Sequence, residues 1–120
     1  MPSPVIHEDR NGLRVHAAEG TRHNGDENWG HRYNFLAGRY PDGIGGTIQF
    51  QCGPVPDRGV NGLTNEAVLA ILIHRIGVLN EKLPCEQNEL VLGNLRTALA
   101  LLEDRTADRV ARGVEGKETV

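Results

Sequence analysis

The 120-residue sequence has little of the chemistry that enzymes need. Serine occurs once, at Ser3, so a serine-hydrolase triad is excluded. The two cysteines, Cys52 and Cys85, form no Cys-x-x-Cys pair, and the five histidines show no i, i+4 spacing, so no zinc site is predicted. The paired carboxylates at 26–27 and 103–104 fall in a polar loop and on a helix flank, without the burial that acid–base catalysis requires. The sequence therefore favours a binding protein that is not an enzyme and has no cofactor or metal.

Excess basic charge and long apolar runs are also absent. Lys plus Arg number 13 against 16 Asp plus Glu, and the net charge of -3 gives no basic field that would attract a nucleic-acid polymer. No apolar run approaches the roughly 20 residues that a membrane span needs, and no cationic segment followed by an apolar one opens the chain. We expect a cytosolic protein with reduced cysteines, in which a local arginine cluster must meet any phosphate-bearing partner.

What is present divides into two compositional halves near Asn61. Most glycines, five of the six prolines and every aromatic residue precede this point, and helix-forming Leu, Ala, Ile, Arg and Glu dominate after it. The predicted fold class is α+β, with a small antiparallel β-hairpin region followed by an antiparallel α-helical hairpin, assembled as an oligomer. The predicted domains are a polar arm over 1–30, a β-hairpin and turn region over 31–60, a helical hairpin over 61–116 and a tail over 117–120.

The first half predicts one β-hairpin behind a loosely ordered arm. Residues 1–30 are too polar to bury much surface. Residues 31–36 and 47–52 alternate apolar and polar side chains as strands do, and the glycine-rich segment 40–46 between them is typical of a turn. Because a two-stranded hairpin alone is marginally stable, its apolar side chains must pack on another element.

The second half predicts two helices of unequal length. Thr64 suits the N-cap of a helix that ends near Asn80. Pro84 suits the start of a second helix, which runs from Glu86 to about Arg112 and would be about 40 Å long at about 1.5 Å per residue. The glycine at 113 is the expected helix stop.

Both helices carry apolar residues on two sides. The stripes expected at the contact between the helices are Val68, Leu69, Leu72, Ile73, Ile76 and Leu79 on the first, and Val91, Leu92, Leu95, Ala98, Leu99, Leu102, Thr106 and Val110 on the second. Ala67, Ile71 and Val78, with Leu90 and Leu101, fall outside these stripes. Self-association would cover them, most simply in a homo-oligomer. The alternative is that the N-terminal hairpin covers them within one chain.

Three arginines near the end of the second helix form a candidate anion site. Arg105, Arg109 and Arg112 follow i, i+4, i+7 spacing and project from one face. Guanidinium groups bind phosphate oxygens through two hydrogen bonds at once, so three in a row suit a phosphate ligand. The alternative is a solvated ladder, in which Asp108 pairs with Arg105 and Arg112.

Several motifs resemble one family. They are Thr-Ile-Gln-Phe-Gln-Cys-Gly-Pro-Val at 47–55, Gly-Val-Asn-Gly-Leu-Thr-Asn-Glu at 59–66, Leu-Ala-Ile-Leu-Ile-His-Arg at 69–75, Pro-Cys-Glu at 84–86, and Arg-Thr-Ala-Asp-Arg-Val-Ala-Arg-Gly-Val-Glu-Gly at 105–116. This set resembles the helical-hairpin domain of phage anti-CBASS and anti-Thoeris sponge proteins over residues 47–116. The extension before it is more similar to the anti-Thoeris branch, Thoeris anti-defence protein one, than to the shorter anti-CBASS branch.

The resemblance implies a homohexamer that binds cyclic nucleotide signals without degrading them. The ligands it implies are glycocyclic ADP-ribose and cyclic di- and trinucleotides. It makes Arg109 and Arg112 the phosphate ligands, with Arg105 and Thr106 beside them. It also makes Phe50 and Asn61 candidates for contacts with a base or ribose.

Two hypotheses of different classes follow. The first is a phage immune-evasion protein that sequesters cyclic nucleotides in the cytoplasm of the infected bacterium. The second is a non-catalytic phage structural or protein-interaction module that oligomerises through the helical hairpin and leaves its arginines solvated. Ligand-induced stabilisation separates the two, because only the first should gain thermal stability with cyclic nucleotides.

Overall fold

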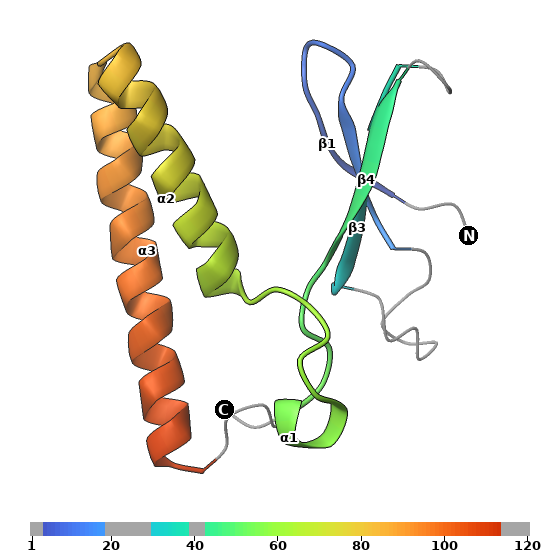
Figure 1. The fold of residues 1–120 in the computed structure, drawn as a ribbon, viewed down its shortest axis with the longest axis vertical. Helices are drawn as coiled ribbons and strands as arrows, with labels where there is room; N and C mark the ends of the chain where they lie inside the picture. Colours follow the sequence, from blue (N-terminus) through green and yellow to red (C-terminus); the bar gives the residue numbers. More distant parts are fainter. Residues whose placement is uncertain (1–3, 19–29, 39–42, 114–120) are drawn as a thin grey trace. The chain divides into compact units, whose positions relative to one another are not determined.

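The computed structural model describes residues 4–18, 30–38 and 43–113, and its elements are labelled in Figure 1. The strands are β1 (Val5–Glu8), β2 (Arg14–Ala17), β3 (Arg32–Ala37) and β4 (Ile44–Gln49), and the helices are α1 (Val55–Arg58), α2 (Asn65–Lys82) and α3 (Glu86–Ala111). The chain forms two compact units: Met1–Cys52 with Pro56–Gly62, and Gly53–Val55 with Leu63–Val120. The first unit contains the sheet and the second contains the two long helices. The predicted order, an antiparallel sheet region followed by a helical hairpin, is confirmed.

The four strands form one antiparallel sheet in the order β1-β2-β3-β4. The central pair aligns Val15 with Phe35, and β3 aligns Phe35 with Gly46 on β4. The ring of Phe35 lies over Gly46, where a Cβ atom would come within 2.5 Å of it. The glycine therefore makes room for the aromatic side chain that covers this part of the sheet.

The first two strands were not predicted, because residues 1–30 were expected to be a loosely ordered arm. That expectation is wrong for residues 4–18, which contain β1 and β2; residues 19–29 lie outside the described part. The turn between the strands is organised by Asp9, whose carboxylate accepts hydrogen bonds from Asn11 N at 2.9 Å and Leu13 N at 3.1 Å. Gly12 supplies the positive φ of 84°. Local turn chemistry thus compensates for a segment with few apolar residues.

The two faces of the sheet differ in chemistry. Alternation along the strands places Val15, Tyr33, Phe35 and Ile48 on one face, and Arg32, Asn34, Thr47 and Gln49 on the other. On the polar face Thr47 Oγ1 donates to Asn34 Oδ1 at 2.8 Å, and Arg32 Nε donates to Gln49 Oε1 at 3.2 Å. These cross-strand pairs fix the register of β3 against β4.

The helical hairpin begins and ends where local chemistry predicts. Thr64 caps α2, with its hydroxyl accepting from Ala67 N at 3.0 Å. Cys85 caps α3, with its Sγ accepting from Asn88 N at 3.4 Å. Gly113 follows α3 with a φ of 72°, the left-handed conformation expected after a helix. The helix boundaries therefore agree with the prediction to within about two residues.

The contact between α2 and α3 is narrower than the predicted stripes. Leu92 is buried and Leu95, Leu99 and Leu102 are half-buried, whereas Val91 and Val110 from the same predicted stripe are exposed. On α2, Leu69, Ile73 and Ile76 are half-buried, and Leu72 and Leu79 are exposed. A single neighbouring helix covers only part of a helix circumference, which explains why the edges of both stripes stay open.

A buried polar clamp closes the hairpin at the connection between its helices. Asn80 Oδ1 accepts from Cys85 N at 3.1 Å, and Asn80 Nδ2 donates to Glu89 Oε1. Asn80 is 9% exposed, so both atoms of its amide are satisfied inside the hairpin. From the sequence, Asn80 was predicted only to lie near the end of a helix, and its hydrogen bonds to Cys85 and Glu89 were not predicted.

We expect Asn80→Ala to destabilise the hairpin by about 1–3 kcal/mol, because it removes both hydrogen bonds of the buried amide, to Cys85 N and to Glu89. The measurement is urea unfolding followed by circular dichroism at 222 nm. The control is Asn94→Ala on the exposed surface of α3, which should be neutral or slightly stabilising because alanine favours helix. Equal transitions for the two variants would contradict the clamp.

No helix within the described residues is long and apolar enough to cross a membrane.

Candidate ligand-binding site

The last turns of α3 hold the predicted arginine cluster. The helix continues to Ala111, and the backbone N of Arg112, the C-cap residue, donates to Asp108 O at 3.0 Å. Gly113 N donates to Val110 O at 3.1 Å and ends the helix. Arg105 and Arg109 thus lie within α3, and Arg112 is its C-cap residue. Helix geometry places the three within about 60° of one another around the helix axis.

Arg109 differs from its neighbours because it is buried, with 6% of its surface exposed. It continues the stripe of α3 that contains Leu102 and the half-buried Thr106, at spacings of seven and three residues. A buried guanidinium acts in a lower dielectric than an exposed one, so its attraction for an anion is stronger. Among the three arginines of the cluster, Arg109 therefore has the surroundings of lowest dielectric, and Thr106 lies one turn before it.

The other two arginines are exposed. Arg112 Nε pairs with Asp108 Oδ2 at 3.1 Å, and the two side chains are 50% and 65% exposed. This is the pairing that the solvated-ladder alternative predicted for Arg112. A phosphate that accepts hydrogen bonds from Arg112 Nε and the neighbouring guanidinium nitrogen must displace the Asp108 carboxylate. The Arg112–Asp108 ion pair is exposed to solvent and is therefore weak enough to be displaced. Arg105 is also exposed on the preceding turns.

Phe50 lies directly after β4, in the other compact unit. Its ring meets that of Tyr33 edge to face, with centroids 5.8 Å apart and planes at 88°. Its backbone N donates to His31 O at 2.6 Å, so the residue extends the pairing of β4. Phe50 is half-buried, and Tyr33 fixes the orientation of its ring.

Asn61 closes the loop that follows Phe50. Its Oδ1 accepts from Cys52 N and its Nδ2 donates to Cys52 O, both at 2.8 Å. Its backbone N donates to Gln51 Oε1 at 3.0 Å, while Gln51 Nε2 donates to Gly59 O at 2.9 Å. Two side-chain amides therefore hold the ends of residues 51–61 together. The role of Gln51 was not predicted from the sequence, because Gln49 and Gln51 are the same residue type on either side of Phe50 and nothing local distinguishes them.

The structure groups the predicted site residues in two sets. Arg105, Thr106, Arg109 and Arg112 lie together on α3, and Phe50 and Asn61 lie together at the end of β4 and in its loop. Among the residues that the structure describes, no three His, Cys, Asp or Glu side chains gather in a way that could hold a metal ion. The two sets contain three guanidinium groups, the Thr106 hydroxyl, the Phe50 ring and the Asn61 amide, which are groups that can form hydrogen bonds, ion pairs or stacking contacts with a ligand.

The fold and the arginine cluster define a helical-hairpin protein with a candidate anion site. A family model described as Acb2/Tad1, hairpin domain, matches residues 42–107. The match spans more than half of the chain, which therefore belongs to the Acb2/Tad1 hairpin-domain family. The resemblance seen in the sequence is confirmed. The matched range includes Phe50, Asn61, Arg105 and Thr106, and it ends two residues before Arg109.

A curated relative agrees with this assignment. The chain is similar to Thoeris anti-defense 1 of Bacillus phage SBSphiJ7, with 42% identity over 71 residues. The alignment covers 58% of this chain and 50% of the relative, so the chain spans about half the length of the curated relative that it matches.

Proposed function

We propose that this chain is a phage immune-evasion protein that binds and sequesters cyclic nucleotide second messengers without cleaving them. It would act against Thoeris or CBASS signalling in the cytoplasm of the infected host. The ligands are glycocyclic ADP-ribose, cyclic dinucleotides or cyclic trinucleotides. The proposal is supported by family membership and by a relative whose name is Thoeris anti-defense 1.

The observation that carries the proposal is the buried Arg109 with exposed arginines on either side of it. Cyclic nucleotides carry two or more negative charges on phosphate groups, and the planar guanidinium fork matches phosphate oxygens. The exposed Arg105 and Arg112 would attract the phosphate groups over a longer range. The buried Arg109 would bind a phosphate directly, in surroundings of lower dielectric. Thr106 adds a hydroxyl at the same end of α3.

Phe50 and Asn61 have different roles in this proposal. The Phe50 ring, fixed by Tyr33, offers an apolar surface for a base. Asn61 uses both amide atoms on Cys52, so its contribution is to hold the loop beside Phe50 in shape.

The proposed protein works as a homo-oligomer, with six copies implied by the family resemblance. The exposed apolar residues on both helices support self-association, because large exposed apolar patches mark interaction surfaces. The second candidate function, a structural or interaction module without a ligand, rests on the same exposed residues.

Two measurements separate the two functions: calorimetric titration and thermal unfolding, each with cyclic dinucleotides, cyclic trinucleotides and glycocyclic ADP-ribose. A ligand at a thousandfold excess over its Kd should stabilise the protein by about 4 kcal/mol, seen as a rise in Tm. An interaction module should show neither heat nor a shift in Tm with any of the three classes.

Bound ligand is expected to be recovered chemically unchanged after the protein is denatured. Sequestration requires only that the ligand be held, and in the part of the chain that the structure describes no three His, Cys, Asp or Glu side chains gather in a way that could hold a metal ion. The measurement is chromatography of the released ligand against an untreated standard after prolonged incubation. A linearised product would contradict sequestration and point to a nuclease or hydrolase.

A further inference from the structure

One side-chain amide fixes the backbone on both sides of Val60, in the loop that follows Phe50. Gln51 Nε2 donates to Gly59 O at 2.9 Å, and Gln51 Oε1 accepts from Asn61 N at 3.0 Å. Both partners are backbone groups of the residues that flank Val60. We call this pair of hydrogen bonds the Gln51 bridge. Because it joins groups two residues apart, the bridge holds the intervening Val60 in a defined backbone conformation.

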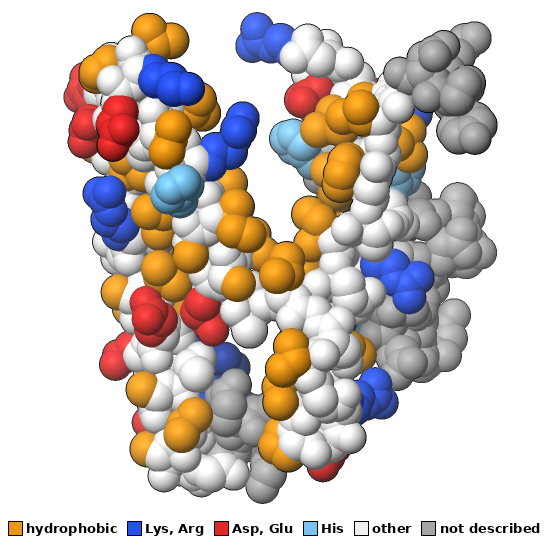
Figure 2. All heavy atoms as spheres, in the orientation of Figure 1, with side chains coloured by type: hydrophobic (Ala, Val, Ile, Leu, Met, Phe, Trp, Pro, Cys, Tyr) orange, Lys and Arg blue, Asp and Glu red, His pale blue; other side chains and the backbone are white. Residues whose placement is uncertain are grey.

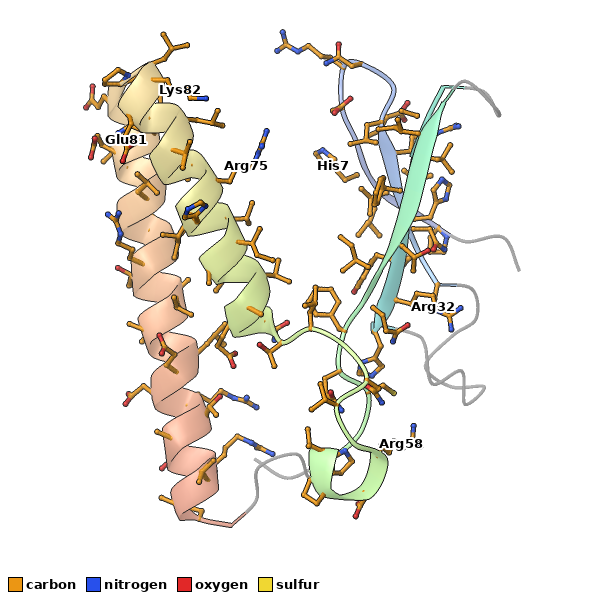
Figure 3. All side chains as sticks on the ribbon, in the orientation of Figure 1. His7, Arg32, Arg58, Arg75, Glu81 and Lys82 are labelled. Carbon is orange, nitrogen blue, oxygen red and sulfur yellow. The ribbon has the colours of Figure 1, made fainter. Side chains whose placement is uncertain are left out.

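Further features of the same loop limit its conformations. The side-chain amide of Asn61 bonds to both backbone groups of Cys52. Arg58 Nη1 donates to Cys52 Sγ at 3.9 Å, and Figure 3 shows Arg58 extending from α1. The prolines at 54 and 56 fix φ at two positions between these contacts. The loop is therefore largely ordered before any ligand binds.

Val60 presents an apolar side chain to solvent from this ordered loop. It is 80% exposed, and Val55 in α1 is 47% exposed. Figure 2 shows hydrophobic side chains on the surface of α1 and of the adjoining loop. The amides of Gln51 and Asn61 are turned to the backbone instead. A β-branched side chain on a fixed backbone loses little conformational freedom when a flat ring packs against it, so such a contact costs little entropy.

We propose that Val60 contacts the base of the bound cyclic nucleotide and that Gln51 is the positioning residue that prepares this contact. This pair of roles rests on the proposed function and deepens it. The apolar Val60 side chain suits the face of a base, whereas the arginines of α3 suit the phosphates. Phe50, directly before Gln51, offers its ring to the same kind of group.

Positioning and direct contact have different effects on the rates of binding. Without the Gln51 bridge the loop samples further conformations, and only the fraction with the original conformation binds. The association rate constant falls by that fraction, while the ligand still leaves from the same bound state at the same rate. Loss of a contact to the ligand instead raises the dissociation rate constant. The two rate constants therefore separate the role of Gln51 from that of Val60.

Two substitutions measure the two roles. Gln51→Met keeps the length of the side chain and removes both hydrogen bonds of the bridge. We expect it to lower the association rate constant about tenfold, the factor for two ordinary hydrogen bonds, and to leave the dissociation rate constant unchanged. Val60→Ala should raise the dissociation rate constant about tenfold, the factor for about two buried methyl groups, and leave association unchanged. The measurement is surface plasmon resonance with glycocyclic ADP-ribose, a cyclic dinucleotide and a cyclic trinucleotide as probes.

Gln49→Met is the matched control for Gln51→Met. The Gln49 amide also makes two hydrogen bonds, accepting from Arg32 Nε at 3.2 Å and donating to Phe50 O at 3.1 Å, but it lies before Phe50 and outside the bridge. This variant should keep both wild-type rate constants. Val5→Ala, at an exposed valine of β1, is the control for the second substitution and should do the same.

Hydrogen exchange at the Asn61 amide, which donates to Gln51, should be faster in Gln51→Met, and unchanged exchange would overturn the bridge. A raised dissociation rate constant in Gln51→Met would mean that Gln51 itself touches the ligand, which overturns its positioning role. Wild-type rate constants for Val60→Ala would overturn the contact. Equal losses in Gln49→Met and Gln51→Met would trace the effect to the end of β4 and also overturn the positioning role. Absence of binding by the wild type would instead overturn the proposed function itself.

Discussion

Replacing Arg109 with alanine is expected to weaken cyclic-nucleotide binding by about 1.5–3 kcal/mol, the range for a hydrogen bond to a charged group. The reason is burial: Arg109 is 6% exposed, so in the proposed site its guanidinium would bind phosphate with little competition from water. The measurement is calorimetric titration of wild type and variant with the same cyclic dinucleotide, cyclic trinucleotide and glycocyclic ADP-ribose. Because Arg109 is buried, Arg109→Ala is also expected to lower thermal stability through the lost packing of its aliphatic stem.

Arg109→Lys separates binding from packing. Lysine keeps most of the stem and the charge, but it lacks the planar fork, so stability should be retained while affinity falls. Arg112→Ala should cost less affinity than Arg109→Ala, because Arg112 already pairs with Asp108 in solvent. Arg96→Ala is the exposed control, about 140° around the helix from Arg109. Equal affinities for wild type and Arg109→Ala would remove the arginine cluster from the site.

The helical half was predictable from sequence because its signals are local. Thr64 has the side chain that accepts a hydrogen bond from Ala67 N, and Gly113 has the conformational freedom to leave a helix. Such signals depend only on residues within one helical turn. The width of the contact between the helices depends instead on their packing, and the exposure of Leu72 and Val91 was therefore not predicted.

The sheet was only half predictable because its first two strands have weak composition signals. β1 and β2 are four residues long, and β1 is exposed along its whole length. Their pairing depends on Asp9 in the turn and on β3, which aligns Phe35 with Val15. A sequence window of this polarity predicts a loose arm, and only the non-local pairing reveals a strand.

The candidate site shows the same division. Arg109 was found from its spacing to Arg105 and Arg112, yet its spacing to Leu102 and Thr106 already placed it on the buried stripe. That second pattern was available in the sequence and would have predicted the burial. The engagement of Asn61 with Cys52 was not available, because it joins residues nine positions apart through an irregular loop.

The Gly62→Ala substitution is expected to destabilise the sheet unit by about 3 kcal/mol or more, because the new Cβ meets backbone. A Cβ at Gly62 would lie 2.4 Å from the carbonyl carbon of Phe50, 2.6 Å from its oxygen and 2.7 Å from Gln49 O. Backbone atoms in a paired strand cannot turn aside as a flexible side chain can. The measurement is urea unfolding followed by near-ultraviolet circular dichroism, which reports the surroundings of the aromatic side chains, Tyr33 and Phe50 among them.

The matched control is Gly77→Ala in α2, where a Cβ meets nothing within 4 Å. The same substitution should there stabilise the helix by about 0.5–1 kcal/mol, since alanine is the better helix former. Opposite signs at the two positions would follow from the close approach at Gly62 alone, and a neutral Gly62→Ala would contradict it.

Gly62→Ala also bears on the ligand site, because Gly62 adjoins Asn61 and lies against Phe50 while Arg109 belongs to the helical unit. If affinity falls while both the near-ultraviolet signal and the signal at 222 nm are retained, the loop at 51–61 contributes to binding; if affinity is unchanged, the conformation of this loop does not limit binding.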